Sequence, residues 1–301
     1  MTSFIETRAD DSTQPIGGYI PKPVYAYIAL ACFAIVSIVF WIRLFTRRPR
    51  YMVWLCAGST AMTVGFAMRI VLHGSPYSLG IYIVEDLCIL LSPCFFLATN
   101  YIILSRLAVS LSTESAPIST TCLLLPAERI AKIFVWSDVI TFWIQASGGG
   151  LSAQQSLAAV GQDIALVGLV LQLLSYALYT VLLLVFGARV RSRYPEVWHM
   201  GKQGGRKEWR VLYYTTCLTC IGILIRSAFR IAEFSEGYNG WIPTHEAYFY
   251  CLDSIPLLLA ISLYMFVWPP VYTHQGQTKE NMPMGSVDNG HTMGGAGRTA
   301  A

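Results

Sequence analysis

The sequence predicts an all-α, polytopic membrane protein with seven transmembrane helices. Three observations support this prediction: the composition, the length of the apolar stretches and the placement of the basic residues. Of 301 residues, 54% are hydrophobic and 13% are charged, whereas about a quarter of the residues in soluble proteins are charged. The mean hydropathy of +0.51 agrees with a chain that lies mostly in lipid.

Seven stretches of about 20 mostly apolar residues follow one another, and a helix of that length crosses a hydrocarbon layer of roughly 30 Å. We place the spans at residues 24–44, 53–72, 81–105, 132–148, 163–188, 209–231 and 246–268. They form one transmembrane domain over residues 24–268. The polar segment before it, residues 1–23, lacks the apolar core of a cleavable signal peptide. The tail, residues 269–301, is rich in Gly and polar residues without periodicity, so we expect it to be disordered.

Lys and Arg residues set the predicted orientation, because positively charged loops stay in the cytoplasm. They crowd the connections after the first, third and fifth spans, and only Arg8 and Lys22 lie on the other side. The N-terminus is therefore predicted outside and the C-terminus in the cytoplasm. Because the basic loops already serve topology, we expect no nucleic-acid partner; contacts with membrane lipids and with a cytoplasmic protein partner stay open.

Ionisable side chains inside the spans are costly in lipid and indicate either pairing or function. In the sixth span, Arg226, Arg230 and Glu233 follow one another at i, i+4 and i+7, so they share one helix face. We expect this face to turn inward and to meet carboxylates of the third and seventh spans. The other residues expected around the same space are Arg69, Glu85, Asp86, Asp138, Gln145, Gln172, Glu246, Tyr250 and Asp253.

Two interpretations of these polar residues stay open. They line a polar cavity that opens outward and binds a ligand, or they form buried ion pairs that only fix the register of the helices. We favour the cavity, because ionisable groups inside a membrane are usually functional. The first span has no comparable residues and is expected at the periphery.

Carboxylates outnumber arginines within the spans. Counted well inside the spans, before the boundary residues Asp163 and Glu246 are added, three arginines are accompanied by five acidic side chains, Glu85, Asp86, Asp138, Glu233 and Asp253. An isolated buried carboxylate is too costly, so the surplus must be protonated, bind a cation or receive a positively charged ligand. An amphiphile that carries an amine, such as a long-chain base or an amino-sterol, meets this need, and a fatty acid does not.

Three consecutive glycines, residues 148–150, lie at the end of the fourth span. Glycine favours helix ends and lets two backbones approach closely. We expect the helix to end here, with either a close backbone approach at Gly149 or a flexible turn.

Several classes of function are disfavoured. No predicted span contains a histidine at its interior, which argues against a His-based metal site and an intramembrane metal hydrolase. The pair Cys217 and Cys220 has no second Cys or His pair, so it predicts packing rather than zinc binding. The chain has no G-x-x-x-x-G-K-[ST] motif for ATP, and the seventh span has no Lys that could hold retinal. We therefore expect no cofactor, no metal and no enzymatic activity.

Six motifs follow one another along the spans: GFAMR, SPCFFLATNYIILSRL, KIFVWSDVITFWIQASGGGL, GLVLQLL, LIRSAFRIAEF and EAYFYCLD. In this order, over about residues 19–270, they resemble the signatures of the fungal RTA-like, lipid-translocating exporter family of seven-span membrane proteins. The resemblance implies the plasma membrane as location, no known enzymatic activity, and ligands such as sphingoid long-chain bases, sterol-like drugs or porphyrins.

Two positions depart from the family pattern. Met62 stands where the family usually has Glu, and Glu85 stands where it usually has Gln. This difference suggests that a carboxylate has moved from one wall of the predicted cavity to another, so the ligand of one member does not transfer directly to this chain.

The sequence therefore predicts a membrane protein that binds and translocates or exports amphipathic, amine-bearing lipids and so confers resistance to toxic amphiphiles. The alternative is a seven-span lipid receptor or sensor without transport activity, for which the same pocket would serve. The sequence alone does not separate these two functions.

Overall fold

The computed structural model describes residues 23–74, 78–112, 116–152, 157–199, 208–236 and 248–273, and every regular element within them is a helix. The longer helices are α2 (Pro23–Arg47), α3 (Val53–Gly74), α4 (Leu79–Leu111), α6 (Ala127–Ser152), α7 (Ala158–Arg193), α9 (Trp209–Glu236) and α12 (Ile255–Phe266). The shorter elements are η1 (Arg50–Met52), α5 (Ile118–Thr121), α8 (Pro195–His199), η3 (Phe249–Ser254) and α13 (Pro270–Thr273). The predicted all-α class is confirmed.

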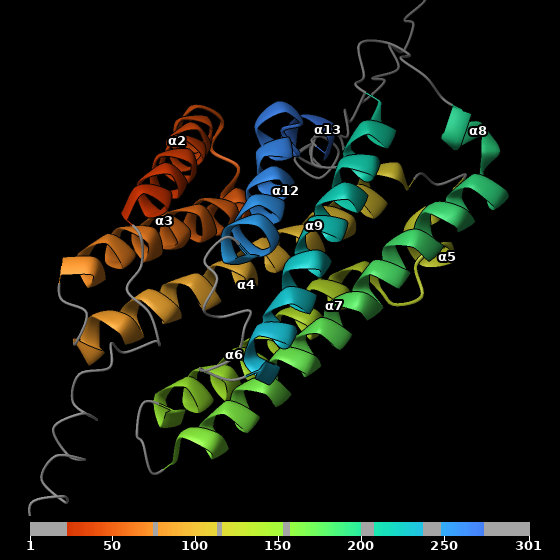
Figure 1. Ribbon diagram of the computed structural model, residues 1–301. Helices are drawn as coiled ribbons and strands as arrows, with labels where there is room; N and C mark the ends of the chain where they lie inside the picture. Colours follow the sequence, from red (N-terminus) through yellow and green to blue (C-terminus); the bar gives the residue numbers. More distant parts are fainter. Residues whose placement is uncertain are drawn as a thin grey trace, which may run out of the picture.

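Helices that follow one another in the sequence pack side by side (Figure 1). The order of contacts runs α2, α3, α4, α6, α7, α9 and α12, and α12 returns to α2. α4 also contacts α7 and α9, so it lies against most of the bundle. Side chains of α4 are therefore placed to meet polar groups from several other helices.

Six helical segments are long and apolar enough to cross a membrane: Pro23–Arg47, Arg50–Gly74, Gly80–Leu111, Ala159–Arg193, Trp209–Glu236 and Phe249–Phe266. They correspond to six of the seven predicted spans. The fourth predicted span falls on α6, which is 26 residues long but less apolar, with Glu128, Lys132 and Asp138 in its sequence. The count of seven spans and the orientation of the termini stay predictions.

α6 carries polar residues on its buried face and apolar residues on its exposed face, as expected for a helix that faces lipid. Its buried face is apolar at Ile130 and Phe134 and then becomes polar or small at Asp138, Thr141, Gln145 and Gly148. Its exposed face carries large apolar side chains at the same spacing, Ile133, Trp136, Ile140 and Trp143. The average hydropathy of α6 combines both faces, so its polar buried residues and its charged N-terminal turns lower the mean although its exposed face is apolar.

The helices extend past the predicted spans at most ends. The fifth span, predicted at residues 163–188, is part of the longer α7. Hydropathy marks only the stretch that lies in hydrocarbon, whereas helical hydrogen bonding continues into the membrane interface. At the end of the domain, the chain continues through α13, where the hydroxyls of Tyr51 and Thr273 lie 3.1 Å apart. Residues 1–22 and 274–301, which hold most of the predicted polar segment and tail, lie outside the described residues.

The glycine run of residues 148–150 does not end a helix, contrary to our expectation: α6 continues to Ser152. The close backbone approach is present, but at Gly148. A Cβ atom at Gly148 would lie 2.7 Å from the carbonyl oxygen of Gly161 and 2.8 Å from the Cα of Ala165, both on α7. At Gly149 the nearest atom would be Asp86 Oδ2 at 3.7 Å, an ordinary contact. The run therefore serves the packing of α6 against α7.

Candidate ligand-binding site

The inward face predicted on α9 is buried and pairs with the seventh predicted span. Arg226 and Arg230 are 2% and 6% exposed, and Asp253 is fully buried. Arg226 Nη1 donates to Asp253 Oδ2, and Arg230 Nε donates to Asp253 Oδ1 at 2.7 Å. Each oxygen of this carboxylate therefore accepts from a different guanidinium, and charge-assisted bonds of this kind are the strong ones in proteins.

A π-helix turns Asp253 toward α9. The element η3 holds Phe249–Ser254 in a wide turn directly before α12, whose second residue is Pro256. Proline lacks a backbone N–H and disturbs the hydrogen bonding of the turn before it. Single turns of π-helix occur often at functional sites, because they rotate the side chains that follow. Here the turn buries Phe249, Asp253 and Ser254 together.

The third predicted span joins this group through a different arginine. Arg69 on α3 donates to Glu85 Oε1 on α4 at 2.7 Å. The ring of Phe249 has its centroid 4.5 Å from the guanidinium carbon of Arg69 and 5.2 Å from that of Arg230. Tyr250 lies beside them, with its centroid 5.9 Å from Arg69. Two cation–π contacts to one ring thus link the two ion pairs.

We call Arg69, Glu85, Arg226, Arg230, Glu233 and Asp253 the arginine cluster. Arg230 Nη1 also donates to Glu233 Oε2 at 3.1 Å, and Arg226 Nη2 donates to the carbonyl oxygen of Ile89 on α4 at 3.0 Å. The cluster holds three guanidinium groups and three carboxylates, so its formal charge is zero. It ties α3, α4, α9 and η3 together in the interior of the bundle.

Two acidic residues of the predicted set have no cation within ion-pair distance among the described residues: Asp86 on α4 and Asp138 on α6. Asp86 is half-buried and faces Gly149 of α6. Asp138 is only 2% exposed. Arg230 and Arg69 still act on Asp86 electrostatically, so Asp138 is the acid of this set that is left without a nearby cation among the described residues.

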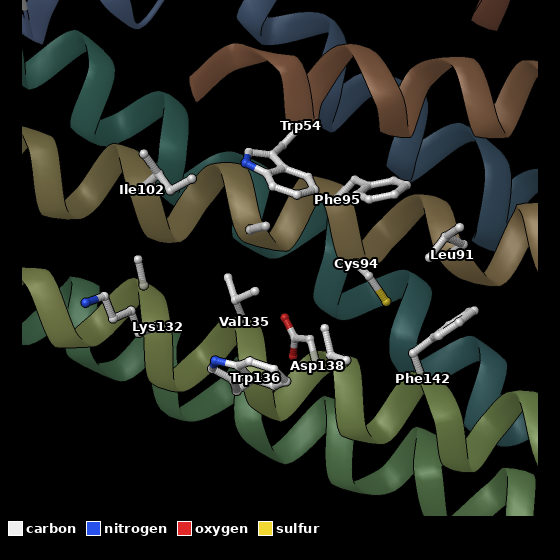
Figure 2. Close-up of a pocket in the computed structure, with 13 residues that line it drawn as sticks. Trp54, Leu91, Cys94, Phe95, Ile102, Lys132, Val135, Trp136, Asp138 and Phe142 are labelled. Carbon is white, nitrogen blue, oxygen red and sulfur yellow. The ribbon is translucent and has the colours of Figure 1, made fainter. Parts of the chain in front are cut away.

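Asp138 lines a pocket of about 340 Å³ between α4 and α6 (Figure 2). Its Oδ2 accepts a hydrogen bond from the Tyr101 hydroxyl at 2.8 Å. Its Oδ1 receives no hydrogen bond from any described residue, although it is buried. The rest of the wall is largely apolar or aromatic, and Trp54 of α3, stacked on Phe95 of α4, closes one side. The pocket thus sets the Asp138 carboxylate among mainly apolar residues, with Lys132 as the other charged residue of the lining.

Gln145 and Gln172 form a second polar connection, between α6 and α7. Gln145 Nε2 donates to Gln172 Oε1 at 3.0 Å, and Gln172 Nε2 donates to the Cys94 sulfur at 3.3 Å. Cys94 also lines the Asp138 pocket. Gly168 lies against Gln145, since a Cβ there would be 2.7 Å from Gln145 Cγ. The two amides therefore support the wall of the pocket from behind.

Sequence reasoning missed a buried polar centre around Asn100 of α4. Its side-chain amide donates to the Tyr176 hydroxyl at 3.0 Å, and its side-chain oxygen accepts from the Tyr264 hydroxyl at 2.7 Å. Its backbone carbonyl oxygen accepts from the Tyr179 hydroxyl at 2.7 Å. Next to it, Tyr101 holds Asp138. An Asn-Tyr pair in the middle of an apolar span was a usable signal, because polar side chains in a span need partners. Its partners on α7 and α12 are too distant in sequence to be inferred.

The predicted site residues thus fall into two groups. Arg69, Glu85, Arg226, Arg230, Glu233 and Asp253 form the arginine cluster with Tyr250 beside it, and Asp138, Gln145 and Gln172 surround the pocket, with Asp86 facing α6. Glu246 lies outside the described residues. Within the described part of the chain, no group of three or more His, Cys, Asp or Glu side chains is placed to hold a metal ion.

The known proteins that resemble this chain include three proteins of the yeast Saccharomyces cerevisiae. Protein RTM1 of Saccharomyces cerevisiae is 30% identical over 203 residues, which is 67% of this chain and 62% of RTM1. Protoporphyrin uptake protein 1 of the same yeast is 29% identical over 68% of this chain and 64% of its own length. The sphingoid long-chain base transporter RSB1 is 22% identical over 90% of this chain and 77% of its own length. The chain thus aligns with less than two thirds of the first two relatives.

No solved structure matches this chain. The family model described as RTA1 like protein matches residues 55–276, from the start of α3 to just beyond α13. This region contains both the arginine cluster and the Asp138 pocket. The apolar helices and these relatives together identify a multi-pass membrane protein. The chain belongs to the RTA1-like family.

Proposed function

We propose that this protein binds amphipathic lipids that carry an amine and translocates or exports them, so that cells resist toxic amphiphiles of this class. The observation that supports the proposal is the surplus of buried acid. The arginine cluster is neutral in itself, and Asp138 has no cationic partner among the described residues; Asp86 makes no ion pair, although Arg230 and Arg69 lie close enough to act on it. The ammonium group of a ligand would neutralise such a carboxylate, whereas a fatty acid would add to the surplus.

The names of the relatives support an amphipathic ligand, and one of the names supports an amine. RSB1 is named as a transporter of sphingoid long-chain bases, which are amines on a long hydrocarbon chain. Another relative is named for the uptake of protoporphyrin, which carries two carboxylic acid groups and no alkylamine, so it supports amphipathic ligands in general and not the preference for amines. We therefore propose amphipathic lipids as the general ligand class, amines as the preferred members and the plasma membrane as the location.

In this proposal the two groups of polar residues have different tasks. The arginine cluster fixes the positions of α3, α4, α9 and η3, as buried ion pairs between helices do. Asp138, which lines the pocket and has no arginine partner among the described residues, faces the ligand. A rearrangement of the helices around the bound head group would then move the ligand between the leaflets.

The direct test is movement of lipid in liposomes that contain only the purified full chain. A fluorescent long-chain amine is added to one leaflet, and its arrival in the other leaflet is followed by chemical quenching. Faster movement than in protein-free liposomes is expected for the amine and not for a carboxylate with the same chain. Equal rates for amine and carboxylate would contradict the proposed ligand class.

The same preparation separates transport from sensing. Saturable binding of the amine without any movement between leaflets would favour a lipid receptor. In cells, expression should reduce sensitivity to cationic amphiphiles relative to an empty vector. Should expression alter sensitivity only towards anionic lipids, the charge argument is wrong.

A further inference from the structure

Starting from the proposed function, we infer that the amine binds to Asp138 in the pocket between α4 and α6, and that the hydrocarbon chain enters this pocket sideways from the membrane. Neither the family match nor the names of the relatives assigns a ligand site. The inference rests on the geometry of this pocket.

Asp138 is prepared to accept one more donor. Tyr101 occupies Oδ2, and Oδ1 receives no hydrogen bond from a described residue. Polar groups buried in proteins are nearly always hydrogen-bonded, so a buried carboxylate oxygen without a donor, on a side chain that lines a pocket, indicates a partner that comes from outside the chain. An ammonium group supplies both the positive charge and up to three donors.

The other walls suit the remainder of such a ligand. Trp54, Phe95, Trp136 and Phe142 contribute aromatic rings to the lining, and aromatic faces attract cations as well as hydrocarbon. The lining also includes Lys132, at the opposite end of the pocket from Phe142 (Figure 2). A cationic head group is therefore drawn toward Asp138 and away from the Lys132 end.

The pocket opens on the outer surface of the bundle. Among the residues that line it, Trp136 is 67% exposed and Trp54 is 46% exposed, so both belong to the surface that faces lipid. Asp138 lies about 9 Å from the cytoplasmic end of the predicted span of residues 132–148, at 1.5 Å per residue, and so within a hydrocarbon layer of roughly 30 Å. A ligand dissolved in the membrane reaches this depth without first passing through water.

The volume fits a head group with part of its chain. A pocket of about 340 Å³ is at the lower end of ligand sites, which range over roughly 300–1,000 Å³. The ammonium group and the first part of a chain would fill it, and the rest of the chain would stay in lipid. The site therefore recognises the head group and tolerates chains of different length.

The test measures binding of three probes with the same chain, a primary amine, an alcohol and a carboxylate, to the purified full chain in nanodiscs. Asp138→Asn keeps an acceptor for Tyr101 but removes the charge. We expect it to weaken amine binding by about tenfold or more and to leave alcohol binding unchanged. The matched control is Asp163→Asn, because Asp163 is an exposed aspartate on α7. A second variant, Ala98→Phe, fills the pocket without changing its charge and should weaken the binding of amine and alcohol alike.

The outcomes distinguish this inference from the proposed function. If wild-type protein shows no preference for the amine, the proposed function itself fails. If wild-type protein prefers the amine and Asp138→Asn keeps that preference, only the site assignment fails. Loss of the preference in Asp86→Asn, with Asp138→Asn unaffected, would likewise overturn the assignment to Asp138.

Discussion

The arginine cluster and the Asp138 pocket use the same chemical group in opposite ways. Asp253 is fully buried between two guanidinium groups, and each of its oxygens accepts a charge-assisted hydrogen bond. Asp138 is nearly as buried, yet it has one tyrosine hydroxyl and an open oxygen. The first carboxylate is complete within the fold, and the second is complete only with a partner from outside.

This difference separates structural acids from ligand-binding acids in a membrane. Replacing a paired carboxylate leaves an unpaired cation buried in the fold. Replacing an unpaired carboxylate leaves no such cation and removes the free-energy cost of burying that acid. Stability and ligand binding should therefore respond in opposite order at the two sites. The following predictions test that order.

The largest effect is expected at Asp253. Asp253→Leu leaves Arg226 and Arg230 buried without the carboxylate that they share, and we expect a loss of about 3–5 kcal/mol in the free energy of unfolding. Thermal unfolding in detergent, read as the fraction of monodisperse protein, measures this loss. Asp163→Leu at an exposed position of α7 is the control. Equal unfolding temperatures for the two variants would show that the cluster is solvated.

The next effect concerns the helix that carries Asp138. Gly148→Val forces a side chain against the backbone of α7, and overpacking of this kind costs about 1–3 kcal/mol. Because α6 must shift, amine binding should fall as well. Gly149→Val is the matched control, since the added side chain meets only an ordinary contact with Asp86. If Gly149→Val proves the more harmful change, the close approach is not at Gly148.

A smaller effect is expected at Glu85, at the edge of the arginine cluster. Glu85→Gln keeps an acceptor for Arg69 but removes the charge, so we expect a loss of about 1–2 kcal/mol. Protection of cells against cationic amphiphiles should weaken only mildly, because glutamine is the residue usual in the family. Protection as low as in an empty-vector strain would move Glu85 from the structural group to the ligand site.

The smallest effect on stability is expected at Asp138. Asp138→Asn leaves no cation unpaired and still accepts from Tyr101, so the free energy of unfolding should change by less than about 1 kcal/mol. Amine binding should nevertheless be lost. A destabilisation as large as that of Asp253→Leu would mean that Asp138 is a structural acid, and the contrast between the two regions would disappear.

The sequence was sufficient for the parts of the fold that depend on local patterns. Hydrophobic stretches predict where the helices lie, and the spacing of Arg226, Arg230 and Glu233 predicts a single inward face, which is what α9 has. The pairing of this face with the seventh span is confirmed at Asp253. The expectation about the third span holds only in part, because Glu85 pairs with Arg69, while Arg226 reaches α4 through the carbonyl of Ile89.

Local patterns were not sufficient where two helices pack closely or where backbone geometry changes. The glycine run at residues 148–150 looks like a helix end, although α6 continues to Ser152 and Gly148 is a packing contact with α7. The π-helix of η3 is also invisible in a spacing argument, because it changes the number of residues per turn at the point where Asp253 faces α9.

The sequence by itself therefore determined the membrane class, the helical faces and the surplus of acidic over basic residues in the spans. Composition and periodicity depend only on neighbours along the chain, so they are readable without the fold. Only the tertiary structure decided which acids are neutralised. Asp253 and Asp138 look alike in sequence, and they differ because the guanidinium groups of α9 reach one carboxylate and none among the described residues reaches the other. Such pairing depends on side chains brought together from helices that are distant in sequence, because the attraction between two charges weakens as their separation increases.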